Sequence, residues 1–184
     1  MRKLNAPWYK YFFVFLYYSF AIHLPKSTNR VFGKISRKIR YDICKHIFEF
    51  CGEDVNIEKG ARFINGFKLR IGNHSGLGVN CFIPDGSKIG DDVMMGPNCY
   101  CLARNHSFNK VDIPMRLQGY LPSQVVVIED DVWIGRDVLI LPGRHIAKGS
   151  IIGAGCVLTK DFPEYSIVGG NPSRLIRSRI ENKE

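Results

Sequence analysis

His106 is the side chain of this sequence best placed to act as a base. It lies in residues 102–127, an irregular stretch between two regular series of repeats. Histidine titrates near neutral pH, so a neutral imidazole can take a proton from a weakly acidic group such as a hydroxyl. No Ser or Cys stands beside a base in a nucleophile motif, so a covalent intermediate is not expected. The other histidines lack this context and are interpreted as structural or surface residues: His23, His46, His74 and His145.

Large apolar residues recur every six positions on both sides of this stretch. Four residues after most of them stands a small or β-branched residue such as Ser75, Cys81 or Val132. A period of six fits neither an α-helix, which places apolar residues three and four apart, nor an isolated strand, which alternates. The first series comprises Ile71, Leu77, Ile83, Ile89, Met95 and Cys101, and the second comprises Ile128, Ile134, Ile140, Ile146, Ile152 and Leu158.

The sixfold period predicts a solenoid of short strands joined by sharp corners, with one large and one small residue of each repeat pointing inward. Glycine follows the aliphatic residue at several corners, where a bulky Cβ would hinder the turn. Pairs such as Asp91-Asp92 and Pro142-Gly143 mark further turns. Ordinary strands with turns would not explain so many apolar positions in register. Residues 102–127 are then an excursion from a rigid scaffold, and such loops are usually functional.

Four motifs accompany the repeats: DDVWIG, IGAG, VLTKD and GGNPSRLIR, the last ending at Arg177. With them, residues 55–177 resemble the hexapeptide-repeat acyltransferases, whose all-β fold is a left-handed parallel β-helix with three hexapeptides per coil. Within that family the sequence resembles above all the sugar and polysaccharide O-acetyltransferases. The resemblance implies direct acetyl transfer from acetyl-CoA to a sugar hydroxyl, with His106 as general base. It also implies a homotrimer whose active site lies between neighbouring β-helices.

The resemblance also assigns residues to acetyl-CoA, the acyl donor. Its pantetheine arm needs backbone amides and small residues along a groove, and its phosphates need cations. Arg136 stands where relatives carry a small residue, and Cys156 replaces a frequent serine. The implied coenzyme A residues are Gly135, Arg136, Gly153, Ala154, Thr159, Lys160, Arg174 and Arg177.

A carbohydrate acceptor is assigned by weaker signals. Asn80 and Asp85 match polar positions of the family, whereas Gly78 and Gly86 stand where relatives carry polar groups. Trp133 is carried over as a wall of the acyl site, with packing in the core or between subunits as the alternative. Asn105, Arg116 and Gln118 are further candidates for sugar contacts, on the basis of position alone. A backbone carbonyl or the carboxylate of Asp112, the only acidic residue of the excursion, is expected to orient His106, and no metal is expected.

Residues 1–50 differ from the rest of the chain in charge. They hold ten Lys and Arg against two Asp and Glu, so they carry eight of the net nine positive charges. The aromatic run in residues 8–22 is too short to span a membrane, which needs about 20 apolar residues. Aromatic and basic residues together suit either an anionic membrane surface or a helix packed on the β-helix or on a neighbouring subunit, with its basic residues in solvent. Eight of the ten basic residues surround the aromatic run: Lys3, Lys10, Lys26, Arg30, Lys34, Arg37, Lys38 and Arg40.

The chain is predicted to have three parts: a helical segment at 1–50, the β-helix at 51–170 and a short helix or tail at 171–184. Residues 31–50 have the spacing of an amphipathic helix that caps the solenoid. Gly52 is expected to end it. Its expected apolar side comprises Val31, Ile35, Ile39, Ile43, Ile47 and Phe50.

Six cysteines are spread along the chain without a Cys-x-x-Cys motif, so a zinc site is not indicated. Cys81 and Cys99 occupy small inward positions and should stack on adjacent coils. They are expected to remain reduced thiols in a cytoplasmic protein, positioned at most peripherally on the inner face of the membrane.

Several other functions remain open or are disfavoured. An antibiotic O-acetyltransferase or a nucleotide-amino-sugar N-acetyltransferase is the near alternative to an enzyme of capsular polysaccharide biosynthesis. A non-catalytic scaffold at a membrane would not need His106, Lys160 and Arg174. The carbonic anhydrase of this fold needs a histidine where Val111 stands. Nucleic-acid binding is not expected, because the basic residues cluster at one end rather than across a folded face.

Overall fold

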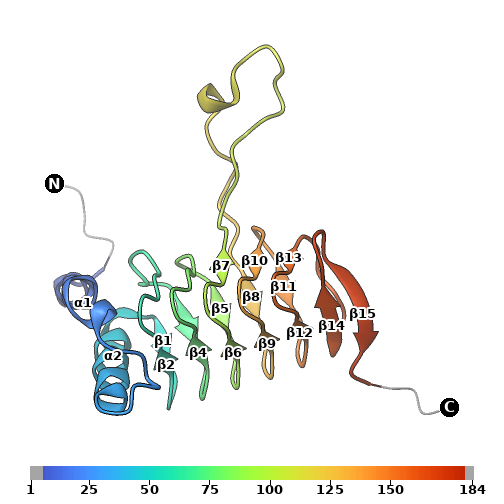
Figure 1. Cartoon of the computed structure of the whole chain (residues 1–184). Helices are drawn as coiled ribbons and strands as arrows, with labels where there is room; N and C mark the ends of the chain where they lie inside the picture. The colour runs from blue at the N-terminus through green and yellow to red at the C-terminus, as the bar shows by residue number, and fades with distance from the viewer. Residues whose placement is uncertain (1–5, 181–184) are drawn as a thin grey trace.

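The computed structural model describes residues 6–180, and in it short strands wind into a parallel β-helix (Figure 1). Helices α1 (Trp8–Ser19), η1 (Ala21–His23, a 3₁₀ turn) and α2 (Gly33–Ile47) lie at its N-terminal end. The 3₁₀ turn η2 (Met115–Leu117) lies in the excursion. Lys3, with the rest of 1–5 and 181–184, is outside the described residues.

The strands form three faces, and consecutive coils pair in parallel. The first face contains β1 (Phe50–Cys51), β3 (Arg70–Ile71), β5 (Lys88–Ile89), β8 (Val127–Ile128) and β11 (His145–Ile146). The second contains β2 (Asn56–Ile57), β4 (Gly76–Leu77), β6 (Met94–Met95), β9 (Trp133–Ile134), β12 (Ile151–Ile152) and β14 (Ser166–Gly169). The third contains β7 (Tyr100–Cys101), β10 (Leu139–Ile140) and β13 (Val157–Leu158), extended by bridges at Arg62 and Phe82.

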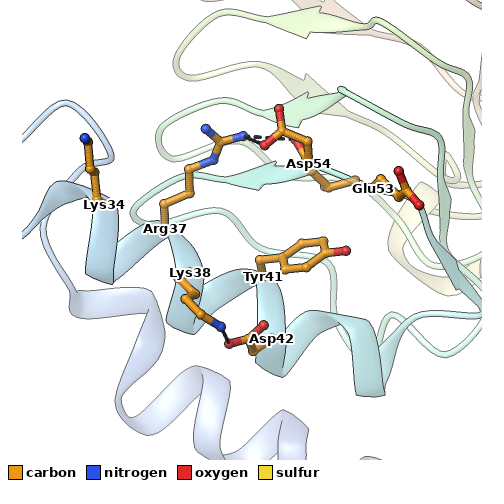
Figure 2. A pocket seen from close by; sticks show the side chains of 8 residues that line it. Lys34, Arg37, Lys38, Tyr41, Asp42, Glu53 and Asp54 are labelled. Atoms are coloured by element: carbon orange, nitrogen blue, oxygen red, sulfur yellow. Dashed lines mark hydrogen bonds and ion pairs between the residues drawn. The ribbon is translucent and has the colours of Figure 1, made fainter.

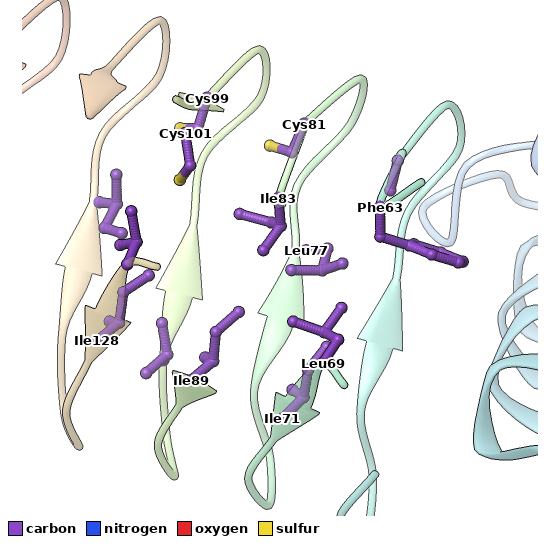
Figure 3. Packing of buried hydrophobic residues seen from close by; sticks show 14 of the residues in the cluster. Phe63, Leu69, Ile71, Leu77, Cys81, Ile83, Ile89, Cys99, Cys101 and Ile128 are labelled. Carbon is purple, nitrogen blue, oxygen red and sulfur yellow. The ribbon is translucent and has the colours of Figure 1, made fainter. Parts of the chain in front are cut away.

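The inward positions confirm the sixfold pattern (Figure 3). Ile71, Ile83 and Ile140 have no exposed surface, and the small partners Ser75 and Cys81 are buried with them. Burying one such aliphatic side chain stabilises the fold by about 1.5–3 kcal/mol. Stacked rows of these residues therefore supply most of the driving force. Two exceptions are half-buried: Met95 of the first series, and Arg144, which stands at the small position four residues after Ile140.

The corners need glycine because the next coil comes so close. A Cβ on Gly135 would lie 2.6 Å from the backbone nitrogen of Ala154, a separation that real side chains do not show. Left-handed backbone occurs elsewhere in the corners, at Asp92 with φ of 57° and at Gly143 with φ of 71°. The turn pairs are thus confirmed, and the glycine that follows several of the aliphatic residues is explained by coil stacking.

Helix α2 differs from the prediction in its end and in its buried side. It ends at Ile47, before Gly52, and Ile35 is 59% exposed. Arg40 is instead fully buried, because its guanidinium satisfies carbonyls that the cap would otherwise leave unpaired. It donates to the carbonyl oxygens of Leu24 (3.3 Å), Pro25 (2.8 Å) and Ile57.

Helix α1 packs on α2 and on the first coil. The Tyr17 hydroxyl donates to the carbonyl of Ala61 at 2.7 Å, and its ring lies 4.7 Å from that of Phe63. Phe13 stacks on His46 of α2 with ring centroids 4.4 Å apart. The packed-helix interpretation therefore holds for one side of α1. Within residues 6–180, no helix combines the length and apolarity that a membrane crossing requires.

The C-terminal segment contains a strand where a helix or tail was expected. β15 (Arg174–Ser178) runs antiparallel to β14 and closes the far end of the second face (Figure 1). Backbone pairing to an open edge decides this outcome, which local sequence does not encode. Cys81 and Cys99 do stack on adjacent coils, both thiols donating to the Gly96 carbonyl at 3.2 Å, and they are free.

Candidate active site

The excursion at 102–127 is a ribbon that leaves the solenoid after β7 and returns at β8 (Figure 1). Its two arms pair antiparallel through Ser107 N to Gly119 O (3.0 Å) and Leu121 N to Asn105 O (2.9 Å). We call this segment the catalytic ribbon. A hydrogen-bonded ribbon can hold a side chain in a fixed place away from the body, which a loose loop cannot.

His106 faces Tyr120 across the ribbon. The two residues form an antiparallel bridge, and their ring centroids are 4.1 Å apart with planes inclined by 35°. The guanidinium carbon of Arg104 lies 4.2 Å from the centre of the same Tyr120 ring. The imidazole is exposed, so a substrate can approach it. The ring contact of His106 is thus with Tyr120, a residue not considered from sequence, where the Asp112 carboxylate or a backbone carbonyl was expected to orient the imidazole.

Sequence reasoning missed Tyr120 because it stands fourteen positions from His106 with no repeat between them. Only the pairing of the arms brings the two together. Gln118, predicted as a sugar contact, instead braces the ribbon from within. Its amide accepts from Lys110 N at 3.1 Å and donates to the carbonyls of Lys110 and Ile113, both at 2.7 Å. Asn105 and Arg116 are exposed on the ribbon.

The small residues predicted for coenzyme A line the corner between the second and third faces, which we call the second corner. Gly135 and Ala154 lie on successive coils there, with backbones too close for a side chain on Gly135. Gly155 has φ of 70°, and a Cβ added to it would meet nothing within 4 Å. This corner therefore leaves backbone open to an extended ligand.

Asn80 also belongs to the second corner, where it is part of a polar ladder. Its amide nitrogen is 3.4 Å from Asn98 Oδ1, and Asn98 in turn donates to Asp137 at 2.8 Å. The hydrogen bond from Asn98 and that from Arg136, at 3.0 Å, hold the pKa of Asp137 below its usual range. Arg136 is thus paired with a neighbouring carboxylate.

The remaining predicted residues occupy the corner between the third and first faces and the C-terminal strand. This third corner is also where the catalytic ribbon leaves. Asp85 accepts from Lys68 N at 2.8 Å. Thr159 Oγ1 lies 3.0 Å from Ser173 Oγ, which also accepts from Thr159 N. Lys160 Nζ lies 5.4 Å from the Phe162 ring centre, and Arg174 and Arg177 are exposed on β15.

Trp133 lies on the outer surface of the second face, 51% exposed. Core packing is therefore excluded for this side chain, and the acyl site or a subunit contact remains. Its neighbour across the pair of strands is Met94, which is also exposed. Together they form an apolar strip beside the second corner.

Within one chain the predicted residues are spread over two corners of the solenoid, the outer surface of the second face and the C-terminal strand. The ribbon with His106 and Asp85 marks the third corner, while Asn80, Gly135 and Ala154 mark the second. The third face separates these corners.

An open pocket of about 650 Å³ between α2 and the first coil does not contain these residues (Figure 2). Its charges neutralise one another: Arg37 pairs with Asp54 at 2.6 Å and Lys38 with Asp42 at 2.7 Å. Among residues 6–180, no cluster of three or more His, Cys, Asp or Glu side chains could hold a metal ion. The pocket is therefore not our candidate site.

Comparison with known proteins places the chain in a family. Residues 126–160 match the model of the bacterial transferase hexapeptide (six repeats), and residues 68–102 match that of the hexapeptide repeat of succinyl-transferase. The galactoside O-acetyltransferase of Escherichia coli is 34% identical over 75% of this chain and 68% of its own length. A chloramphenicol acetyltransferase of Agrobacterium fabrum is 34% identical over 85% and 71% respectively. The chain belongs to the hexapeptide-repeat transferases.

Solved structures agree with this assignment. A galactoside acetyltransferase in complex with coenzyme A superposes with a TM-score of 0.74 and 26% identity, covering 97% of this chain and 84% of that one. A Vibrio cholerae hexapeptide-repeat acetyltransferase with acetyl coenzyme A gives 0.70 and 31%, covering 78% of each chain. Within its family, the chain is an acetyltransferase.

Proposed function

We propose that the protein is an acetyl-CoA-dependent O-acetyltransferase that modifies a sugar hydroxyl, with His106 as general base. The observation that carries the proposal is the exposed imidazole, held against Tyr120 on a ribbon braced by its own hydrogen bonds. The relatives that bind coenzyme A or act on a galactoside supply the substrate class. The residues proposed to bind acetyl-CoA, the acyl donor, are Gly135, Arg136, Gly153, Ala154, Thr159, Lys160, Arg174 and Arg177.

The reaction needs one base and no covalent enzyme intermediate. His106 takes the proton of the acceptor hydroxyl, whose oxygen attacks the acetyl carbonyl carbon. The carbon–sulfur bond breaks, and the imidazolium returns its proton to the departing thiolate of coenzyme A. A backbone N–H at the groove would stabilise the oxyanion. These reaction steps require neither an oxidant nor a metal ion.

The proposed active assembly is a homotrimer. Large apolar side chains cover the catalytic ribbon without being buried, including Phe108 at 60% and Leu117 at 61% exposure. Such a ribbon is expected to lie against another copy, and closed cyclic symmetry is the usual solution. The third corner of one chain would then meet the second corner of the next. A protein that sediments as a monomer and still has full turnover would contradict this arrangement.

The direct test is His106→Ala with thiol release from acetyl-CoA as the readout. Turnover should fall about 100-fold or more, the usual scale for a lost general base, while acetyl-CoA affinity and folding change little. His145→Ala is the matched control, because that imidazole pairs with Glu129 on the first face. Near-normal turnover of the His106 variant would place the base elsewhere.

The acceptor is proposed to belong to surface or capsular polysaccharide synthesis, at the cytoplasmic side where acetyl-CoA is made available. The similarity to a chloramphenicol acetyltransferase favours an antibiotic hydroxyl as second candidate. A panel of sugars, lipid-linked oligosaccharides, amino-sugar nucleotides and chloramphenicol separates these candidates, including N-acetylation. Absence of turnover with all of them, at intact acetyl-CoA binding, would favour a scaffold.

A further inference from the structure

In helix α1 the charged residue faces the protein and several aromatic residues face outward, the reverse of the usual amphipathic arrangement. Its one cation, Lys10, points inward and donates to the carbonyl oxygens of Ile47 (2.8 Å) and Phe48 (3.2 Å) at the end of α2. Burial there lowers the pKa of the Lys10 ammonium. The outward side carries Trp8, Tyr9, Phe12, Phe15 and, just beyond the helix, Phe20, whereas the Tyr11 ring packs edge-on against Phe67 with centroids 5.0 Å apart.

The outward side of α1 is therefore an uncharged aromatic ridge. Trp8, Phe12 and Phe15 follow helical spacing and are 74%, 55% and 69% exposed, so they lie along one line of the helix. A helix that only packed on the solenoid would turn its rings inward and its lysine to water. The inner side already has its own packing through Tyr17 and Phe13. The ridge must then serve an outside surface.

Immediately after the ridge lies a pocket of about 400 Å³ with positive charge, which we call the cationic pocket. Its lining residues are His23, Pro25, Lys26, Thr28, Asn29 and Lys59. No acidic residue is among them. The nearest acid in sequence, Glu58, is occupied by the amide and hydroxyl of Ser27 and by Asn56. His23 N donates to Phe20 O at 3.1 Å, which joins pocket and ridge in one structure.

We propose that the aromatic ridge and the cationic pocket together form a docking surface for an anionic phospholipid membrane. Aromatic rings are favoured at the headgroup boundary, and lysines are attracted to its phosphates. α1 would lie in the plane of that boundary, since it is too short to cross. Lys26 and Lys59 of the cationic pocket complement such a surface, whereas residues 51–184 as a whole are nearly neutral.

The docking surface lies on the N-terminal cap, outside the residues proposed for catalysis. Its test is consequently independent of acetyl transfer. The full-length protein is mixed with phosphatidylcholine vesicles, with or without phosphatidylglycerol, and the bound fraction is measured by flotation. Binding to the anionic vesicles should be strong at low salt. It should fall as salt rises, because the Debye length shrinks from about 30 Å at 0.01 M to about 3 Å at 1 M.

Two pairs of variants assign the binding to ridge and pocket. Phe12→Ser with Phe15→Ser should weaken partitioning at least tenfold, and Ile180→Ser, an exposed apolar residue on the C-terminal side, should not. Lys26→Gln with Lys59→Gln should weaken binding to anionic vesicles about fivefold for each lysine. Lys68→Gln with Lys88→Gln removes the same charge elsewhere and should have a smaller effect. Circular dichroism and turnover on a soluble acceptor confirm that each variant is folded.

Three results would overturn the proposal. The first is that the wild-type protein does not bind anionic vesicles at low salt. The second is a ridge variant whose oligomeric state changes in sedimentation while vesicle binding does not, which would assign the ridge to a second copy of the chain. The third is that the wild-type protein does not bind vesicles but binds inorganic phosphate, and that the Lys26/Lys59 variant does not bind phosphate. That result would make the pocket a site for free phosphate.

Discussion

Replacing Tyr120 tests whether an aromatic ring, rather than a carboxylate, positions the catalytic base. In the proposed mechanism His106 must present one ring nitrogen to the acceptor, and the Tyr120 ring at 4.1 Å is the contact that restricts its rotation. Tyr120→Ala removes that ring and leaves the backbone pairing of the ribbon, since Ser107 N still reaches Gly119 O. Tyr120→Phe keeps the ring and removes only the hydroxyl.

The size of the effect follows from the contact. An aromatic pair contributes about 0.5–1.5 kcal/mol beyond the area that it buries. If that free energy serves to hold the imidazole in its productive orientation, kcat should fall about two- to twelvefold in Tyr120→Ala. His106→Ala should lose about 100-fold or more, because the base itself is gone. Tyr120 is thus expected to act as a positioning residue with an intermediate effect.

The assay is steady-state thiol release with the acceptor found in the panel, analysed as separate kcat and KM values. We expect Tyr120→Ala to change kcat while the KM for acetyl-CoA stays near wild type, and Tyr120→Phe to restore kcat. An equal loss in both variants would assign the role to the hydroxyl. Wild-type kcat in Tyr120→Ala, with His106→Ala inactive, would refute the positioning argument.

Other predictions concern the cap and the corners. Arg40→Met should lower the free energy of unfolding in urea by about 3–5 kcal/mol, because it removes a buried guanidinium that pairs with Glu58 at 3.7 Å and donates to backbone carbonyls. Arg37→Gln, at an exposed pair, should change it by about 1 kcal/mol or less. Burial acts to raise the pKa of Glu58, but hydrogen bonds from Ser27, Asn56 and Lys59 together hold that pKa below its ordinary value. Its contribution to stability is therefore complete above about pH 4.3 and is lost as pH falls through the folded pKa, and Glu58→Gln should flatten the unfolding curve there. Gly135→Val should destabilise the fold by about 1–3 kcal/mol in thermal melts, since its side chain would meet the next coil.

The apolar period predicts the solenoid because each inward residue packs on its counterpart one coil away. Ile71, Ile140 and Cys81 could all be placed in the core from spacing alone. That logic fails at the two ends, where no further coil follows. Arg40 is buried because the cap has carbonyls to satisfy, and β15 forms because β14 offers an open edge. Neither condition is visible in local sequence.

The sequence by itself determined the family, the β-helix and the candidate base His106, since these depend on residue type and on a period repeated along the chain. The tertiary structure alone decided which residue contacts that base, which side of α1 faces outward and which corner each predicted ligand contact occupies. Tyr120 reaches His106 only through the antiparallel arms of the ribbon. Lys10 turns inward only because the end of α2 presents carbonyl oxygens to it. Contacts of this kind depend on elements distant in sequence, so spacing cannot encode them.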